Sequence, residues 1–219
     1  MLDTVIFSLI KGLPFSIKKK LIEDHKSPKK AIVNLKISLR EVNSKTGLKI
    51  LNQINSNAIV DKAEKIIQEC MENKIQIIPY WDNFYPKDLI HCIDAPFLIY
   101  SKGEQNPNTQ SLISIVGTRN CTDYGLKEIK RILNYLKPYP IGIVSGLAYG
   151  IDIYAHRTAN ELNLVNHAVL GGGINRIYPK KHLEDSQKIK ENGILISEYS
   201  TNEGPRAYHF PRRNRIIAG

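Results

Sequence analysis

Four short apolar runs alternate with helical segments in the second half of the chain, and this alternation limits the fold more than any other feature. The runs are LISIV (112–116), IGIVS (141–145), HAVL (167–170) and ILISEY (194–199). Continuous apolar runs rich in β-branched residues are typical of strands buried on both faces. Strands alternating with helices of this length predict an α/β fold with a parallel, doubly wound sheet.

The segments between these runs carry helix signals. Thr122 stands where it can cap the first helix, and Gly193 is predicted to end the third. The apolar positions of the first helix fall on one face, which predicts a single buried stripe; they are Leu126, Ile129, Leu133 and Leu136.

Residues 1–66 predict a separate small helical domain, and residues 67–219 the α/β domain. The first segment consists of helical stretches divided by Gly-, Pro- and Ser-rich breaks. Its turn KGLP (11–14) resembles helix-hairpin-helix and SAM-like modules; the alternative is a small bundle with solvated lysines. Two further short strands, IQIIPY (75–80) and FLIY (97–100), lead into the second domain.

The net charge and the composition of the chain indicate what kind of partner it binds and in which compartment it works. The net charge of +10, concentrated before residue 60, favours a polyanionic partner; the alternative is compositional drift that enriches Lys, Ile and Asn together. No apolar run reaches the roughly 18–20 residues of a membrane span. Three isolated cysteines indicate a reducing cytoplasm, and six scattered histidines predict no metal site.

Each predicted strand ends in a glycine or a polar turn. Ligands of such sheets bind beyond the carboxyl ends of the strands, where glycines let backbone amides approach an anion. The turns are Gly117-Thr118-Arg119, Ser145-Gly146, Gly171-Gly172-Gly173 and Glu198-Tyr199-Ser200. Arg119 supplies the guanidinium fork suited to phosphate. These turns predict a phosphate site.

Motifs of nucleotide cofactors and of catalysis are missing. The sequence has neither GxxxxGK[ST] nor GxGxxG after the first strand, so we expect no cofactor. Ser145, Asp152 and His156 could suggest a hydrolase, but GIVSG is not a GxSxG nucleophile elbow. A capping aspartate and a hydrogen-bonded histidine are the favoured interpretation, and no catalytic residue is predicted.

The closing stretch GPRAYHFPRRNRIIAG (204–219) interleaves aromatic residues with arginines, and its last residues begin a new buried segment. Rings beside phosphate-neutralising arginines are typical of sites for unpaired nucleic acid. The alternative is a solvated loop, or arginines that pair with carboxylates such as Glu198.

Five ordered motifs resemble the DNA-processing protein A family, also called DprA or Smf. They are SIVGTRNCTDYG, IVSGLAYGIDIYAHRTA, AVLGGGINRIYPKKH, GILISEY and GPRAYHFPRRNRIIAG. The resemblance covers the chain from about residue 74 to the end. It implies an extended Rossmann-like domain that is incomplete at its C-terminus, because family members continue with further strands and helices.

The resemblance also implies a function. Family members are not enzymes: they bind single-stranded DNA during natural transformation, protect it, help to load the RecA recombinase, and form homodimers when the domain is complete. Carried over by motif, the DNA-binding residues would be Gly117, Thr118, Arg119, Ser145, Gly146, Arg206, Phe210, Arg213 and Asn214. Phe210 would stack on a base. Arg206 would replace the basic residue that the family usually has at the position of Ala207.

A nucleotide-processing enzyme is the alternative on a similar sheet. Phosphoribohydrolases of the lysine-decarboxylase-like type carry PGGxGT followed by a catalytic glutamate. This chain has LGGGIN (170–175), and the next acid is Glu184, which favours the DNA-binding interpretation.

Overall fold

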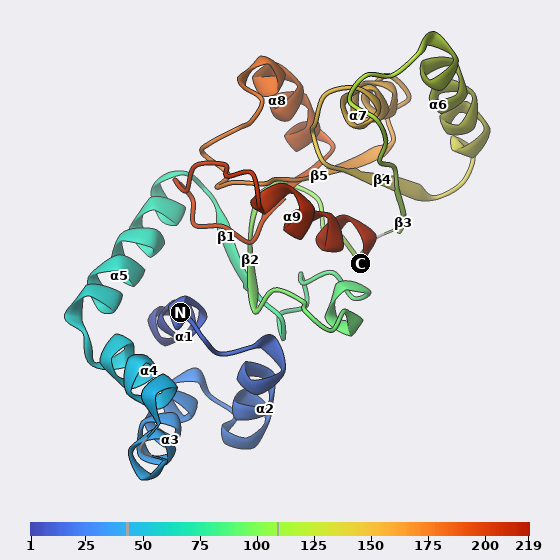
Figure 1. Cartoon of the computed structure of the whole chain (residues 1–219). Helices are drawn as coiled ribbons and strands as arrows, with labels where there is room; N and C mark the ends of the chain where they lie inside the picture. Colours follow the sequence, from blue (N-terminus) through green and yellow to red (C-terminus); the bar gives the residue numbers. More distant parts are fainter. Residues whose placement is uncertain (43, 109) are drawn as a thin grey trace. The chain divides into compact units, whose positions relative to one another are not determined.

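The computed structural model describes residues 1–42, 44–108 and 110–219. The chain divides into two compact units, Met1–Lys74 with Ile93–Leu98, and Ile75–Cys92 with Ile99–Gly219 (Figure 1). The predicted boundary between residues 66 and 67 falls inside the last helix of the first unit. Asn43, in the predicted helical domain, and Thr109, in the loop before LISIV, lie outside the described residues.

The first unit is helical, as its sequence predicts. Its helices are α1 (Leu2–Leu9), α2 (Phe15–His25), α3 (Pro28–Glu41), α4 (Lys45–Asn55) and α5 (Asn57–Glu72). Helix α4 gives no clear signal in the sequence. Ser44 caps it by accepting a hydrogen bond of 2.9 Å from the Gly47 amide. A Cβ at Gly47 would lie 3.0 Å from the Ser44 hydroxyl, so glycine, a poor helix former, allows this tight cap.

A buried lysine closes the core of this unit. Lys18 is 6% exposed, and its Nζ donates a hydrogen bond of 2.8 Å to the Ser8 carbonyl. The ammonium lies above the Phe7 and Phe97 rings, which meet edge to face at 5.3 Å. Burial lowers the pKa of Lys18 to about 8. The lysine thereby binds a carbonyl at the end of α1 that no helical amide satisfies.

The second unit contains a six-stranded sheet. Its strands are β1 (Gln76–Pro79), β2 (Leu98–Gly103), β3 (Ser111–Ser114), β4 (Ile141–Ser145), β5 (Val165–Val169) and β6 (Gly193–Ser197), in the spatial order β1-β2-β6-β5-β4-β3. β3, β4, β5 and β6 pair in parallel, which confirms the prediction for the four runs. β2 pairs antiparallel with β6, so the sheet is mixed at this end.

The strand order corrects the prediction of a doubly wound sheet. β3 to β6 follow one another in space as they do in sequence, and right-handed crossovers then place all connecting helices on one face. These helices are α6 (Asp123–Leu136), α7 (Ile151–Glu161) and α8 (Leu183–Glu191). They lie on one side of the strands in Figure 1, and the C-terminal helix α9 (His209–Ala218) lies on the other.

Local details confirm some predictions and correct others. Thr122 caps α6 by accepting from the Gly125 amide, and Leu133 is fully buried, but the other positions of its predicted stripe are only half-buried. β5 and β6 are buried throughout, whereas β3 is an edge strand and is not buried on both faces. Gly193 begins β6 instead of ending the helix, and a Cβ there would lie 1.7 Å from the Asn166 carbonyl oxygen.

Helix α9 was not predicted, although its last residues were expected to be buried. Ile216 and Ile217 are buried, and the Ser114 hydroxyl donates to the Ile217 carbonyl. Arg215 forms an ion pair with Glu198 just beyond β6, and Arg212 lies 3.6 Å from the same carboxylate. Two of the four closing arginines therefore pair with Glu198, as the alternative interpretation of the stretch foresaw.

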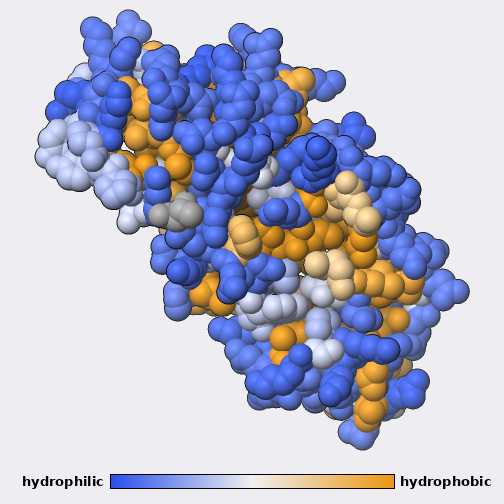
Figure 2. Space-filling model, turned by 180° about the vertical axis from the view of Figure 1, so that it is seen from behind, coloured by the Kyte–Doolittle hydropathy of each residue, from blue (hydrophilic) through white to orange (hydrophobic). Residues whose placement is uncertain are grey.

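Figure 2 shows one outer face, on which hydrophilic side chains dominate and hydrophobic ones gather in separate patches. Among the residues that the structure describes, every helix is too short or too polar to cross a bilayer.

The ion pair between α9 and the end of β6 predicts a difference between neighbouring arginines. Arg215 and Glu198 have side chains 13% and 8% exposed, whereas Arg212 is 63% exposed. Arg215→Met is expected to lower the free energy of unfolding by about 3–5 kcal/mol, because it leaves a buried carboxylate without this partner. Arg212→Met, the control, should lower it by less than about 1 kcal/mol. Urea denaturation measures both, and equal losses would contradict the assignment.

Two buried histidines predict the pH dependence of stability. His156 and His167 are fully buried, and burial lowers the pKa of each to about 4. The unfolded chain, with a histidine pKa of about 6.5, binds more protons than the folded chain between these values. The free energy of unfolding should therefore fall as pH drops from about 6.5 to 4, by up to about 1.4 kcal/mol per pH unit for each histidine. Urea denaturation at pH 7 and pH 5 measures this slope, and His167→Leu should flatten it; a slope unchanged by the substitution would contradict the assignment.

Candidate nucleic-acid interface

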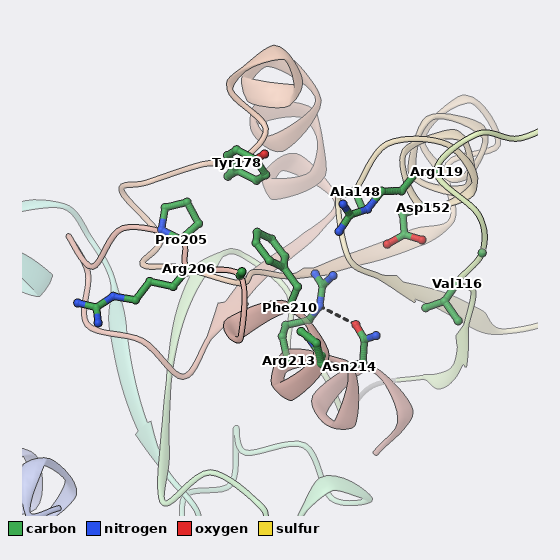
Figure 3. A pocket seen from close by; sticks show the side chains of 13 residues that line it. Val116, Arg119, Ala148, Asp152, Tyr178, Pro205, Arg206, Phe210, Arg213 and Asn214 are labelled. Carbon is green, nitrogen blue, oxygen red and sulfur yellow. Dashed lines mark hydrogen bonds between the residues drawn. The ribbon is translucent and has the colours of Figure 1, made fainter.

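A pocket of about 650 Å³ opens beyond the carboxyl ends of the parallel strands (Figure 3). Its walls come from the turn after β3, the turn after β4 with the start of α7, the segment after β5, and α9 with the loop before it. The lining residues are Val116, Gly117, Arg119, Ala148, Asp152, Tyr178, Pro205, Arg206, Ala207, Phe210, Pro211, Arg213 and Asn214. Segments far apart in the sequence thus meet where ligands of parallel sheets bind.

Phe210 rises from the first turn of α9 between a second ring and a guanidinium (Figure 3). Its ring centroid lies 5.5 Å from that of Tyr178, with 50° between the planes, and the Arg119 guanidinium carbon lies 5.9 Å away over the ring. A Cβ at Gly171 would lie 2.8 Å from Cδ1 of Phe210, so the glycine gives the ring room beside the end of β5. Tyr178 is 51% exposed, which leaves its ring open to a ligand.

Arg213 is buried, at 4% exposure, and connects α9 to two strand ends. Its Nη1 donates a hydrogen bond of 2.6 Å to the Gly146 carbonyl and another to the Val169 carbonyl, while Nε donates to the Asn214 side chain at 3.1 Å. A Cβ at Gly146 would lie 2.4 Å from this guanidinium, so glycine permits the contact. Burial lowers the pKa of Arg213, and Asp152 raises it. These contacts fix where α9 carries Phe210.

Asp152 places a carboxylate among the backbone amides of the pocket. Burial raises its pKa, while Arg213 and the amides of Gly117, Ala148 and Gly146 lower it. The amides at the ends of β3 and β4, which sequence analysis expected to face phosphate, thus face this side chain in the free protein. Asp152 holds the two turns together, and Arg213 balances its charge.

Six of the nine predicted site residues line the pocket: Gly117, Arg119, Arg206, Phe210, Arg213 and Asn214. The other three are not among its lining residues. The Ser145 hydroxyl is buried and donates to the Ile115 carbonyl at 2.6 Å, Thr118 accepts from the Asn120 amide at 3.2 Å, and Gly146 binds Arg213. Arg206 points away from Phe210 in Figure 3, and its Nη1 donates to the Tyr208 hydroxyl at 3.2 Å.

The side chains of a hypothetical hydrolase triad bind other partners. The Ser145 hydroxyl bonds to a backbone carbonyl, and the His156 ring bonds to the Leu147 amide and the Asn166 side chain. Within the described ranges, no group of three His, Cys, Asp or Glu side chains could hold a metal ion.

Tyr178 and Ala148 also line the pocket, although the sequence does not predict them as site residues, and it predicts only a capping role for Asp152. Tyr178 is separated from its strand by an irregular segment, residues 170–177, so strand ends alone do not point to it. The sequence does contain a signal for Asp152, because this acid lies in the first turn of a helix that follows a glycine-containing strand end. Its long-range contact with the turn after β3 is set by the tertiary fold.

Comparison with known proteins identifies the family. The family of DNA recombination-mediator protein A matches residues 76–219. Protein Smf of Escherichia coli K12 is 38% identical over 144 residues, and Protein Smf of Synechocystis is 32% identical over 217 residues. These matches cover 65% and 97% of this chain, and 38% and 54% of those proteins.

Solved structures agree. The X-ray structure of DNA processing protein A from Streptococcus pneumoniae matches with a TM-score of 0.80 and 28% identity, covering 100% of this chain and 74% of that one. A structure of the Helicobacter pylori protein, which concerns its single-stranded DNA binding mode, matches with a TM-score of 0.58 and 27% identity over 66% of this chain and 64% of that one. The chain spans about half the length of the curated relatives named above, or less. By its sequence and its fold, the chain belongs to the DNA recombination-mediator protein A family, known as DprA or Smf.

Proposed function

We propose that this chain binds single-stranded DNA in the pocket beyond β3–β6. The observation that carries the proposal is the meeting of Phe210, Tyr178 and Arg119 in one cavity. Aromatic rings bind unpaired bases by stacking, and guanidinium groups bind the phosphates between them. In a duplex the bases are already stacked on one another, so rings inside a pocket favour a single strand.

The charge of the chain and the solved relative support this proposal. The net charge of +10 attracts a polyanion at long range. The Helicobacter pylori relative, by its description, binds single-stranded DNA, and its match covers 66% of this chain. We assign DNA contact to Arg119, Arg206, Asn214 and the Gly117-Thr118 turn, and base stacking to Phe210. Ser145, Gly146 and Arg213 would act by shaping the walls.

The role that we propose for the complete protein is the one that the resemblance to its family implies. As part of a complete family member, the protein would protect incoming single-stranded DNA in the cytoplasm during natural transformation. It would help to load RecA, act as a homodimer, and catalyse no reaction of its own. The two units of this chain would be the helical N-terminal domain and the DNA-binding domain of that protein.

Equilibrium binding tests the core of the proposal. Fluorescence anisotropy should show that a dT oligonucleotide binds more tightly than a duplex of equal length, with an affinity that falls steeply as salt rises. Equal affinity for both forms, or no binding at low salt, would refute it. Release of free base from a nucleoside monophosphate would instead indicate a phosphoribohydrolase.

Arg119→Ala is expected to weaken binding of the dT oligonucleotide about three- to tenfold and to lower the salt slope by about one, because one phosphate contact is lost. Arg131→Ala is the matched control, since Arg131 lies on α6, outside the pocket, and pairs with Glu128. Titrations at several salt concentrations measure both effects. An equal response of the two variants would remove Arg119 from the interface.

Phe210→Leu is expected to weaken dT binding by about 1–3 kcal/mol, because leucine keeps apolar contact with Gly171 but cannot stack on a base. Anisotropy titration measures the affinity, and thermal unfolding reports the change in stability. A loss of stability with unchanged affinity would show that the ring serves packing alone.

A further inference from the structure

Leu147, in the turn between β4 and α7, has an unusual backbone for its residue type. Its φ is +56°, in the left-handed region that a leucine rarely adopts, and its side chain is fully buried. Such a conformation persists only where surrounding contacts hold it, and it is frequent at binding sites. The two peptide planes on either side of its Cα show which contacts these are.

The first peptide plane joins Gly146 to Leu147. At one end, the Gly146 carbonyl accepts the 2.6 Å hydrogen bond from Arg213. At the other end, the Leu147 amide donates to Nε2 of His156 at 3.3 Å. A rotation of this plane would therefore break the contact with His156 and the contact with Arg213 together.

The second peptide plane joins Leu147 to Ala148 and has the same arrangement. The Leu147 carbonyl accepts from Nδ1 of His182 at 2.9 Å. The Ala148 amide hydrogen-bonds the Asp152 carboxylate and lowers its pKa. Ala148 itself lines the pocket. Each plane thus has a buried histidine at one end and a pocket side chain at the other.

Hydrogen bonding assigns a proton to Nδ1 of both rings. Nε2 of His156 accepts, so the neutral ring carries its proton on Nδ1 and donates it to Oδ1 of Asn166 at 2.5 Å. Asn166 is oriented in turn, because its Nδ2 donates to the His156 carbonyl at 2.9 Å and to the Asn160 side chain at 2.8 Å. His182 donates from Nδ1 to the Leu147 carbonyl.

We propose that His156 and His182 are positioning residues that fix the two peptide planes around Leu147 and thereby hold Arg213 and Asp152 in their places in the pocket. For its effect on DNA the inference rests on the proposed function; for the backbone it stands alone. Neither ring lines the pocket, and both are buried behind it, at 0% and 3% exposure. They act through the backbone, on residues that a ligand would meet.

The test uses pairs of variants in the full chain. His156→Leu and His182→Leu remove the hydrogen bonds to Leu147 at similar volume. His156→Gln keeps an acceptor for the amide, and His182→Asn keeps a donor for the carbonyl. His167→Leu is the matched control, because His167 is equally buried but binds the Ile194 amide instead.

The leucine variants at 156 and 182 are expected to weaken binding of a dT oligonucleotide about five- to tenfold, as expected for loss of one orienting hydrogen bond. The affinity of the Gln and Asn variants for the dT oligonucleotide should stay within about threefold of that of the unchanged protein. His167→Leu should lower thermal stability and leave the affinity unchanged. Unchanged affinity in both folded leucine variants, or an equal loss in His167→Leu, would overturn the inference.

Amide hydrogen exchange separates this inference from the proposed function. The Leu147 amide should be protected in the unchanged protein, and it should exchange at least about tenfold faster in His156→Leu but not in His167→Leu. Unchanged protection would overturn the inference even if DNA binds, and faster exchange would support it even if no DNA binds. If His156→Leu does not fold, ring nitrogen NMR of the unchanged protein decides: a proton on Nε2 of His156 would overturn the inference.

Discussion

The buried guanidinium of Arg213 is the contact on which the rest of the pocket depends. It satisfies carbonyl groups at the ends of β4 and β5 at once, and its charge is balanced by Asp152. A buried cation is tolerated only with such partners. Since Arg213 lies one turn after Phe210 on the same helix, its anchoring also determines where the ring stands. Arg213, which the resemblance places among the DNA-binding residues, thus connects α9 to the sheet.

The order of the strands explains why α9 can pack against the sheet. Because α6, α7 and α8 occupy one face of the sheet, the other face is open to α9. The start of α9 reaches the carboxyl ends of the strands, where the turns after β3 and β4 already converge. The pocket therefore combines two turns of the parallel sheet with a helix that arrives from the opposite side.

Local sequence signals predicted where strands and helices form better than how deeply each of them is buried. The four apolar runs correctly gave β3 to β6 and their parallel pairing, and Thr122 correctly marked the start of α6. The periodicity could not show that β3 lies at an edge, because burial of a strand depends on its neighbours in space. It also missed α9, since Arg213 looks polar in sequence although it occupies a buried helical position together with Ile216 and Ile217.

The residues of the site show the same difference between local signals and long-range contacts. Glycine turns pointed to the edge of the sheet where the pocket opens, because carboxyl ends of parallel strands share that edge. The resemblance to the family added the residues of α9, and six of the nine expected residues line the pocket. Tyr178 and the contacts of Asp152 were missed, since both depend on irregular segments that only the folded chain brings together. The sequence left open whether the closing arginines pair with Glu198, and the position of α9 shows that Arg212 and Arg215 do.

The guanidinium of Arg119 lies over the ring of Phe210 in the free protein. An incoming base would compete with it for that ring face, so stacking replaces an existing cation–π attraction of about 0.5–1 kcal/mol instead of filling an empty site. The displaced guanidinium would then be free to follow a neighbouring phosphate. In the proposed complex, the contributions of these two side chains to the affinity would therefore be coupled and would not add.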